Sequence, residues 1–139
     1  MAAVPPPGSA LSGLTILLVE DDQDVRDAVE ALLVLEGAEV VACAGAAAAL
    51  DVLGGGAPLD LLITDVVLGE PLSGFDVAAA AMAYRSALPI LLITGYAGTA
   101  TRDLPRPVPV LLKPFRYVEL LDAINAVLRR QPASIAAAA

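Results

Sequence analysis

The sequence predicts an α/β fold: a five-stranded, parallel, doubly wound sheet with helices on both faces. Two observations lead to this prediction. Five short runs rich in Leu, Ile and Val are apolar on both faces, which is typical of buried parallel strands. Helical patterns alternate with them, giving a (βα)5 order. The expected strands are Leu14–Val19, Glu39–Cys43, Leu59–Thr64, Pro89–Thr94 and Val108–Leu112.

The expected helices differ in how clearly the sequence marks them. In the first, apolar residues recur at spacings of three and four, and Gly37 then favours an end. The segment that should hold the fourth of five helices contains two glycines, two threonines and Pro105, so only a short helix near Gly98–Asp103 is expected. The other four expected helices cover Asp24–Glu36, Ala46–Leu53, Phe75–Ala87 and Arg116–Arg130.

The 139 residues suit one domain. Residues 1–12 are mostly Ala, Pro, Gly and Ser, and we expect a disordered tail there. The domain is expected to cover residues 13–131, followed by a flexible, alanine-rich tail over residues 132–139.

Composition excludes several classes of protein. The chain has no histidine, which rules out Ser-His-Asp catalysis and a His-ligated zinc site, and its one cysteine cannot form an internal disulfide. A net charge of −8 disfavours binding to nucleic acid or to an anionic membrane. Much of the 58% hydrophobic content is alanine, and no run suits a membrane span, so we expect a cytoplasmic protein. Cys43 is expected to be a small buried hydrophobe.

Polar residues follow four of the five expected strands. The carboxyl ends of parallel strands lie at one edge of a sheet, where ligands of doubly wound folds bind. For each acid alone, a helix cap or dipole partner is the commoner role, and Asp22 and Asp24 fit that interpretation. The convergence of all four ends is what favours a functional site, and its members are Glu20, Asp21, Asp22, Asp65, Thr94, Gly95 and Lys113.

These residue types match the needs of phosphoryl transfer. Clustered carboxylates repel one another unless a cation neutralises them, and oxygen ligands suit Mg²⁺. A carboxylate beside Mg²⁺ is able to attack phosphorus and form an aspartyl phosphate. The phosphoryl oxygens then need compensating partners, which a Lys ammonium and a Thr hydroxyl supply.

Four motifs carry a family resemblance over about Leu14 to Arg130. The motifs are Leu17-Leu18-Val19-Glu20-Asp21-Asp22, Ile63-Thr64-Asp65-Val66-Val67, Leu92-Ile93-Thr94-Gly95-Tyr96 and Leu111-Leu112-Lys113-Pro114-Phe115. With these motifs, the chain resembles the receiver domain of two-component response regulators, of both stand-alone and hybrid-kinase types. The resemblance implies a flavodoxin-like receiver fold with strand order 2-1-3-4-5.

The resemblance also implies a role for each site residue. Asp65 would be the phosphoacceptor and would also bind Mg²⁺ or Mn²⁺. Asp21 would bind the ion directly, Glu20 would bind it through water, and the Val67 backbone carbonyl would be a further ligand.

The other implied roles concern the phosphoryl group. Thr94 would donate a hydrogen bond to it and Lys113 would pair with it. The peptide bond between Lys113 and Pro114 is typically cis in this family.

Three positions bear on switching and access. Val110 stands where receivers commonly carry a switch aromatic, so no rotating ring reports phosphorylation there. Tyr96, after Gly95, either covers the acyl phosphate or packs locally at a helix start. Val67 offers no polar group to hold a hydrolytic water, which predicts a long-lived phosphoryl group. The loop Leu68–Gly74 borders the site and is a candidate contact for the donor.

The resulting function is a phosphoacceptor in a two-component phosphorelay. The donor would be a phosphohistidine on a sensor histidine kinase or histidine phosphotransfer protein. Only nine residues follow Arg130, so no DNA-binding output domain is expected, and output would go to an unknown protein target. The expected surface is the fourth helix, fifth strand and last helix, and a weak homodimer through it is left open.

Two alternatives remain from the sequence. A Mg²⁺-dependent phosphatase of the haloacid-dehalogenase type also uses an aspartyl phosphate, but its nucleophile follows the first strand. The other alternative is an interaction module of receiver fold that is never phosphorylated. Apart from its own phosphotransfer and dephosphorylation, the chain is not expected to be an enzyme.

Overall fold

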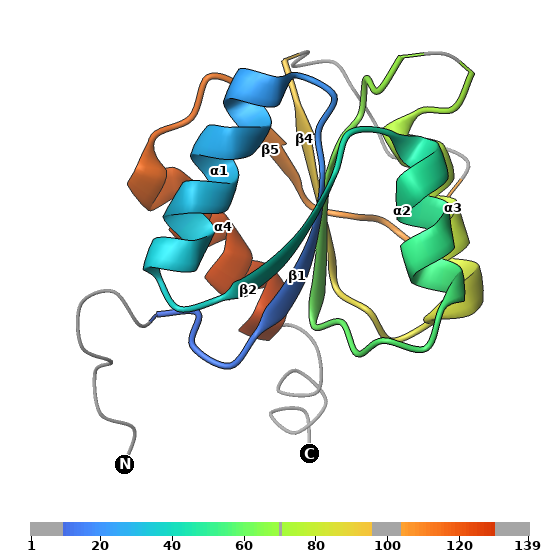
Figure 1. The fold of residues 1–139 in the computed structure, drawn as a ribbon, viewed down its shortest axis with the longest axis horizontal. Coiled ribbons are helices and arrows are strands. Elements are labelled where there is room, and N and C mark those ends of the chain that lie inside the picture. Colours follow the sequence, from blue (N-terminus) through green and yellow to red (C-terminus); the bar gives the residue numbers. More distant parts are fainter. Residues whose placement is uncertain (1–9, 70, 96–103, 130–139) are drawn as a thin grey trace.

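The computed structural model describes residues 10–69, 71–95 and 104–129. Strands and helices alternate along these ranges, apart from the segment between the last two strands, part of which is not described (Figure 1). The expected helix at Gly98–Asp103 falls there, and the label α4 therefore marks the last helix. The elements are β1 (Thr15–Val19), α1 (Gln23–Leu35), β2 (Glu39–Cys43), α2 (Ala46–Gly54), β3 (Leu61–Asp65), α3 (Gly74–Tyr84), β4 (Ile90–Thr94), β5 (Val110–Leu112) and α4 (Tyr117–Arg129).

The five strands form one parallel sheet in the order β2-β1-β3-β4-β5, which confirms the predicted fold class and strand order. The register aligns the carboxyl ends of the strands. Val19 of β1 pairs with Cys43 of β2 and Thr64 of β3, and Asp65 pairs with Ile93 of β4. Residues directly after these positions therefore emerge at one edge.

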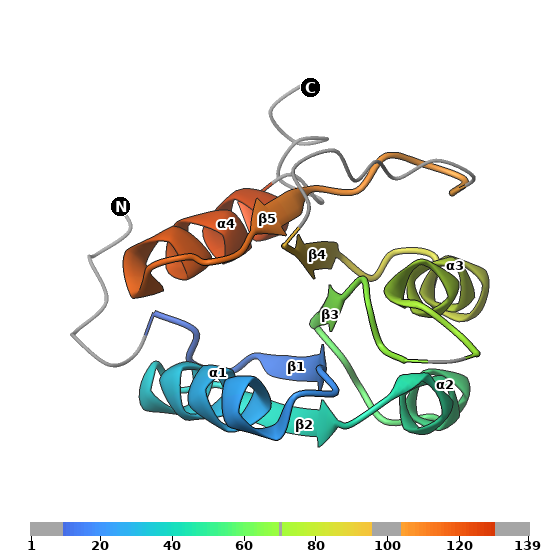
Figure 2. The same cartoon turned by 90° about the horizontal axis from the view of Figure 1, so that it is seen from above.

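Helices cover both faces of the sheet. Figures 1 and 2 show α1 and α4 on one face and α2 and α3 on the other. Alternate residues of β1 enter different cores: Ile16 and Leu18 pack with α1 and α4, whereas Leu17 and Val19 pack with α2 and α3. Every residue of β3 and β4 is buried, because both faces of these strands are covered.

The first and fourth strands begin one residue later than predicted, and the third and fifth begin two residues later. The third begins at Leu61, since Asp60 lies outside the strand and its Oδ2 accepts a 2.8 Å hydrogen bond from the Thr15 N–H. The fifth begins at Val110, directly after Pro109, which has no N–H to donate to the ladder.

Helix α3 ends at Tyr84 rather than at the predicted Ala87. The next residue, Arg85, leaves the helical conformation (φ −141°, ψ 73°). Its guanidinium donates hydrogen bonds to four carbonyl groups at and after the end of α2, those of Val52, Leu53, Gly55 and Ala57. These acceptors include carbonyls that a helix end leaves without intrahelical partners.

The predicted tail boundary after residue 12 is wrong for the part that the structure describes. Leu11 is fully buried and packs in the core beneath α1 and α4. Its N–H donates to the Glu36 carbonyl at 2.8 Å, and the Ala10 N–H donates to Glu36 Oε1 at 3.2 Å. Tyr117 Oη donates to Glu36 Oε2, so this carboxylate joins the N-terminal segment, α1 and α4.

One smaller expectation, for Cys43, agrees with the structure. Cys43 is buried at the end of β2, as a small core residue would be. Among the helices of the described ranges, none has the length and apolar character needed to cross a membrane.

The burial of Leu11 generates a prediction about stability. Leu11→Ala should lower the free energy of unfolding by about 2–4 kcal/mol, since it leaves a cavity between β1, α1 and α4. Leu35→Ala is the control, because Leu35 is 65% exposed and should lose at most about 0.5 kcal/mol. Urea denaturation measures the loss of free energy of unfolding in both variants. Equal losses would show that the buried Leu11 contributes no more stability than the exposed Leu35.

Candidate functional site

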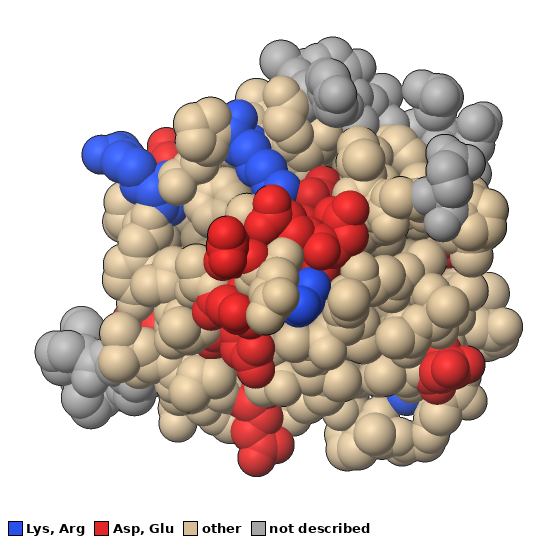
Figure 3. Space-filling model, turned by 45° about the horizontal axis from the view of Figure 1, so that its top comes forward, with Lys and Arg blue, Asp and Glu red and all other residues tan. Residues whose placement is uncertain are grey.

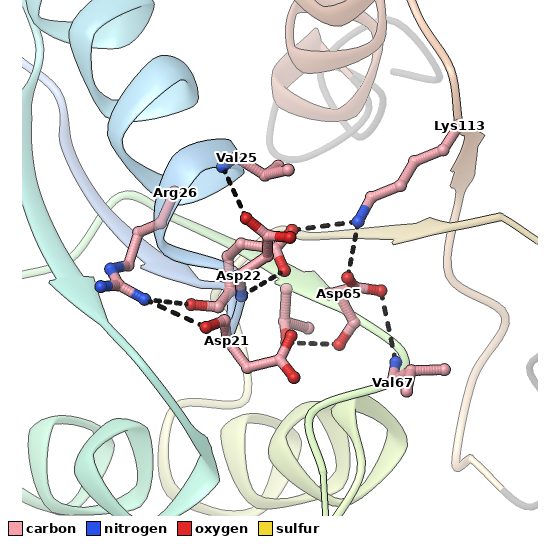
Figure 4. A network of polar contacts seen from close by, with 9 residues as sticks. Asp21, Asp22, Val25, Arg26, Asp65, Val67 and Lys113 are labelled. Carbon is pink, nitrogen blue, oxygen red and sulfur yellow. Dashed lines mark hydrogen bonds and ion pairs between the residues drawn. The ribbon is translucent and has the colours of Figure 1, made fainter.

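The polar residues predicted at the strand ends lie together at the carboxyl edge of the sheet. Glu20 follows β1, Asp65 is the last residue of β3, Thr94 is the last residue of β4, and Lys113 follows β5. Figure 4 shows the side chains of Asp21, Asp65 and Lys113 converging from three strands. The sheet order therefore brings together residues up to 93 positions apart in the chain.

Lys113 bridges two buried carboxylates. Its Nζ donates to Asp65 Oδ2 at 2.7 Å and to Glu20 Oε1 at 3.0 Å. Its backbone N–H donates to the Thr94 carbonyl at 2.7 Å. This hydrogen bond holds the backbone that follows β5 against the end of β4. The peptide bond between Lys113 and Pro114 is cis, as the resemblance implies.

Burial and charge shift the pKa values of this cluster. Burial raises the pKa of Glu20, and the nearby Asp65 carboxylate adds to this, outweighing the lowering effect of Lys113 and the Asp22 N–H. Burial alone would lower the pKa of Lys113, but its hydrogen bonds to Asp65 and Glu20 outweigh that effect and raise it. The ammonium form of Lys113 is thus the form that the site stabilises.

Three carboxylates of this cluster offer a cation site. Glu20, Asp21 and Asp65 each present one oxygen, and these oxygens lie within 4.8 Å of one another. With one ammonium nearby, the ionised group carries two uncompensated negative charges, which a divalent cation would balance. An all-oxygen donor set suits Mg²⁺ or Mn²⁺ rather than zinc. Asp21 is exposed, which leaves the cluster open to solvent.

The site continues onto an acidic surface. Figure 3 shows acidic side chains gathered on the face near the carboxyl edge of the sheet. Asp22 and Asp24, at the start of α1, are exposed. The cap interpretation is confirmed for Asp22, which precedes α1 and accepts a 3.1 Å hydrogen bond from the Val25 N–H.

Sequence reasoning missed two residues that support this cluster. Arg26 Nη1 donates to the Glu20 carbonyl at 2.9 Å and to the Asp21 carbonyl at 3.5 Å, so it holds the loop that carries both acids. Thr64 is fully buried, and its hydroxyl donates to the Asp65 carbonyl at 2.9 Å. A cation one turn after the N-cap Asp22 was the only signal for Arg26, and Thr64 was marked only by its place before Asp65 in a strand-end motif.

Among the described residues expected to affect switching and access, Val67 contacts the cluster directly. The Val67 N–H donates to Asp65 Oδ1 at 3.3 Å, and its side chain is 52% exposed. Val110 is half-buried on β5, and Gly95 is exposed after β4. Tyr96 lies outside the described residues.

The bridging position of Lys113 generates a prediction about stability. Lys113→Met leaves Glu20 and Asp65 without their shared cation and should lower the free energy of unfolding by about 1–3 kcal/mol. Added Mg²⁺ should raise the melting temperature of this variant more than that of the wild type, because it replaces the lost charge. The control is Arg116→Met, whose arginine is largely exposed beside Glu119. Equal responses of both variants to Mg²⁺ would contradict the prediction.

Comparison with known proteins agrees with this geometry. The model of the response regulator receiver domain matches residues 16–125. The response regulator receiver protein CpdR of Brucella abortus is 36% identical over 116 residues, covering 81% of this chain and 95% of CpdR. This chain spans about half the length of several other curated relatives that it matches.

Solved structures show the same fold. A response regulator receiver protein from Sinorhizobium medicae superposes with a TM-score of 0.76 at 31% identity, over 84% of this chain and 94% of that one. The receiver domain from the hybrid histidine kinase CckA gives 0.69 at 30% identity, over 82% and 98%. Together with the family match over most of its length, these similarities show that the chain belongs to the receiver domains of two-component response regulators.

Proposed function

We propose that this receiver accepts a phosphoryl group on Asp65 from a phosphohistidine of a partner protein and signals through protein–protein contacts. The observation that carries the proposal is the pair of contacts of Lys113 Nζ with Asp65 and Glu20. They place the Asp65 carboxylate against an ammonium and close to two further acids, at a site open to solvent through Asp21. Such an arrangement suits a nucleophile that must receive a highly charged group.

The proposed metal ligands come from the acidic cluster. Asp21 and Asp65 would bind Mg²⁺ or Mn²⁺ directly, Glu20 would act through water, and the Val67 carbonyl would complete the protein ligands. The bound ion supplies positive charge to the phosphoryl oxygens as they approach Asp65. The donor set and its two uncompensated negative charges support this assignment.

In the transfer itself, a carboxylate oxygen of Asp65 forms the new bond to phosphorus. The bond between phosphorus and the imidazole nitrogen of the donor breaks, and its electron pair stays on that nitrogen, which takes a proton. Lys113 would exchange its contact with Asp65 for one with the phosphoryl group, and the Thr94 hydroxyl would donate to another phosphoryl oxygen. Because these 139 residues include no histidine, the phosphohistidine of the donor must lie outside them.

The proposed donor is a sensor histidine kinase or a histidine phosphotransfer protein. The similarity to the receiver of the hybrid histidine kinase CckA supports a donor of this class. Output through a protein target rather than through DNA is supported by the net charge of −8. The phosphatase alternative is disfavoured, because its nucleophile opens an Asp-x-Asp pattern directly after the first strand, whereas β1 is followed here by Glu20, Asp21 and Asp22.

The phosphoacceptor assignment is tested with acetyl phosphate and Mg²⁺ as probes. The wild type should gain the mass of one phosphoryl group, and Asp65→Asn should gain none, because the amide is not a nucleophile. Asp51→Asn, which changes an exposed acid on α2, should react like the wild type. Intact-mass spectrometry reads all three. An unmodified wild type would favour an interaction module, and an equal gain in Asp65→Asn would move the acceptor elsewhere.

The side chain of Val67 generates a prediction about the lifetime of the phosphoryl group. Wild-type aspartyl phosphate should outlast seconds, and Val67→Asn should shorten its lifetime several-fold, because an amide is able to orient an attacking water. Val118→Asn is the matched control, since Val118 on α4 is 51% exposed and Val67 is 52% exposed. Loss of the phosphoryl group from the wild type within seconds would contradict the prediction.

A further inference from the structure

The N-terminus of α3 packs directly against the backbone of Asp65. Gly74, the first residue of the helix, is buried, and its N–H donates to the Val66 carbonyl at 2.7 Å. A Cβ atom built on Gly74 would lie 1.9 Å from the Asp65 carbonyl oxygen and 2.8 Å from the Asp65 carbonyl carbon. Gly74 is not one of the described glycines with a positive φ, so its backbone conformation does not call for glycine. Glycine is required here by the close approach of two backbones.

The helix has little freedom to retreat from this contact. Ser73 is its N-cap, and it forms a capping box with Asp76: Ser73 Oγ accepts from the Phe75 N–H, and Asp76 Oδ2 accepts from the Ser73 N–H at 2.7 Å. One turn further on, Val77 and Ala78 are fully buried in the core.

The Asp65 backbone is held from other sides as well. The Thr64 hydroxyl donates to the same Asp65 carbonyl that Gly74 contacts, at 2.9 Å. The Val66 N–H donates to the Ile93 carbonyl of β4 at 2.9 Å. The peptide group between Asp65 and Val66 is thus fixed by α3, by β4 and by its own strand.

We propose that Gly74 and Thr64 are positioning residues that hold the Asp65 carbonyl and so aim its carboxylate at the site where phosphoryl transfer takes place. This inference rests on the proposed function of Asp65. The carboxylate meets two partners at fixed positions, Lys113 Nζ at 2.7 Å and the Val67 N–H at 3.3 Å. A Cβ at Gly74 would need at least 3.0 Å from backbone atoms, so it displaces the Asp65 carbonyl or α3 by more than an ångström. Misplacement of that size costs on the order of 100-fold in a reaction that depends on alignment.

The test compares Gly74→Ala with Gly54→Ala. Gly54, the last residue of α2, has open space around its Cβ position and serves as the matched control. Rates of phosphorylation by acetyl phosphate are measured at saturating Mg²⁺, at a temperature where circular dichroism shows each variant fully folded. Gly74→Ala should react about 10–100-fold more slowly, and Gly54→Ala within about twofold of the wild type.

Thr64 provides a second measurement that does not depend on the folding of Gly74→Ala. Thr64→Val keeps the shape of the buried side chain but removes the donor to the Asp65 carbonyl, and it should slow phosphorylation several-fold. Thr64→Ser restores the hydroxyl and should recover the rate. A role confined to stability would leave the rate of the folded variants unchanged.

The outcomes separate this inference from the proposed function. A wild-type chain that is never phosphorylated overturns the function of Asp65 and this inference with it. If the wild type is phosphorylated, but at the same rate as folded Gly74→Ala and Thr64→Val, only the positioning role is overturned. If Gly74→Ala does not fold, an unchanged rate in Thr64→Val overturns the positioning role, whereas a loss that Thr64→Ser repairs supports it.

Discussion

The contact of one ammonium with two buried carboxylates is the constraint on which the rest of the site depends. Lys113 reaches Asp65 and Glu20 from β5, although β4 lies between β5 and β3. Two strand spacings amount to about 10 Å, so the long side chain of lysine is needed to span them. This geometry depends on the strand order and on the aligned carboxyl ends of the strands. It also depends on the hydrogen bond that holds the Lys113 backbone to the end of β4. Without the ammonium, burial of the two acids would be strongly unfavourable.

The same interaction suits the site to the phosphoryl group that we propose it receives. Lys113 compensates part of the negative charge but leaves a surplus that suits a divalent cation. Under the proposed function, the contacts of Gly74 and Thr64 with the Asp65 backbone would keep the direction of its carboxylate when Lys113 changes partners. An electrostatically driven transfer requires a rigidly held acceptor carboxylate and an ammonium group that is able to move.

The sequence predicted the sheet and the polar strand ends because both depend on local patterns. Runs that are apolar on both faces identify parallel strands, and parallel strands bring their ends together. The residues that it did not predict act through contacts between distant segments. Leu11 lies in a tail-like composition yet fills a core gap, and Arg85 ends α3 because carbonyls of another helix lie within its reach. The need for Gly74 depends on a backbone approach that no local pattern encodes.

A crystal structure of the chain with Mg²⁺ and beryllofluoride, a phosphoryl analogue, would show directly whether Asp65 is the phosphoacceptor. We expect the analogue on an Asp65 oxygen and the ion beside Asp21, Asp65 and the Val67 carbonyl. We also expect that Lys113 Nζ moves from the Asp65 carboxylate to a fluorine of the analogue. A structure obtained under these conditions in which Asp65 carries no analogue, no ion binds, and Lys113 keeps both carboxylates would contradict these expectations.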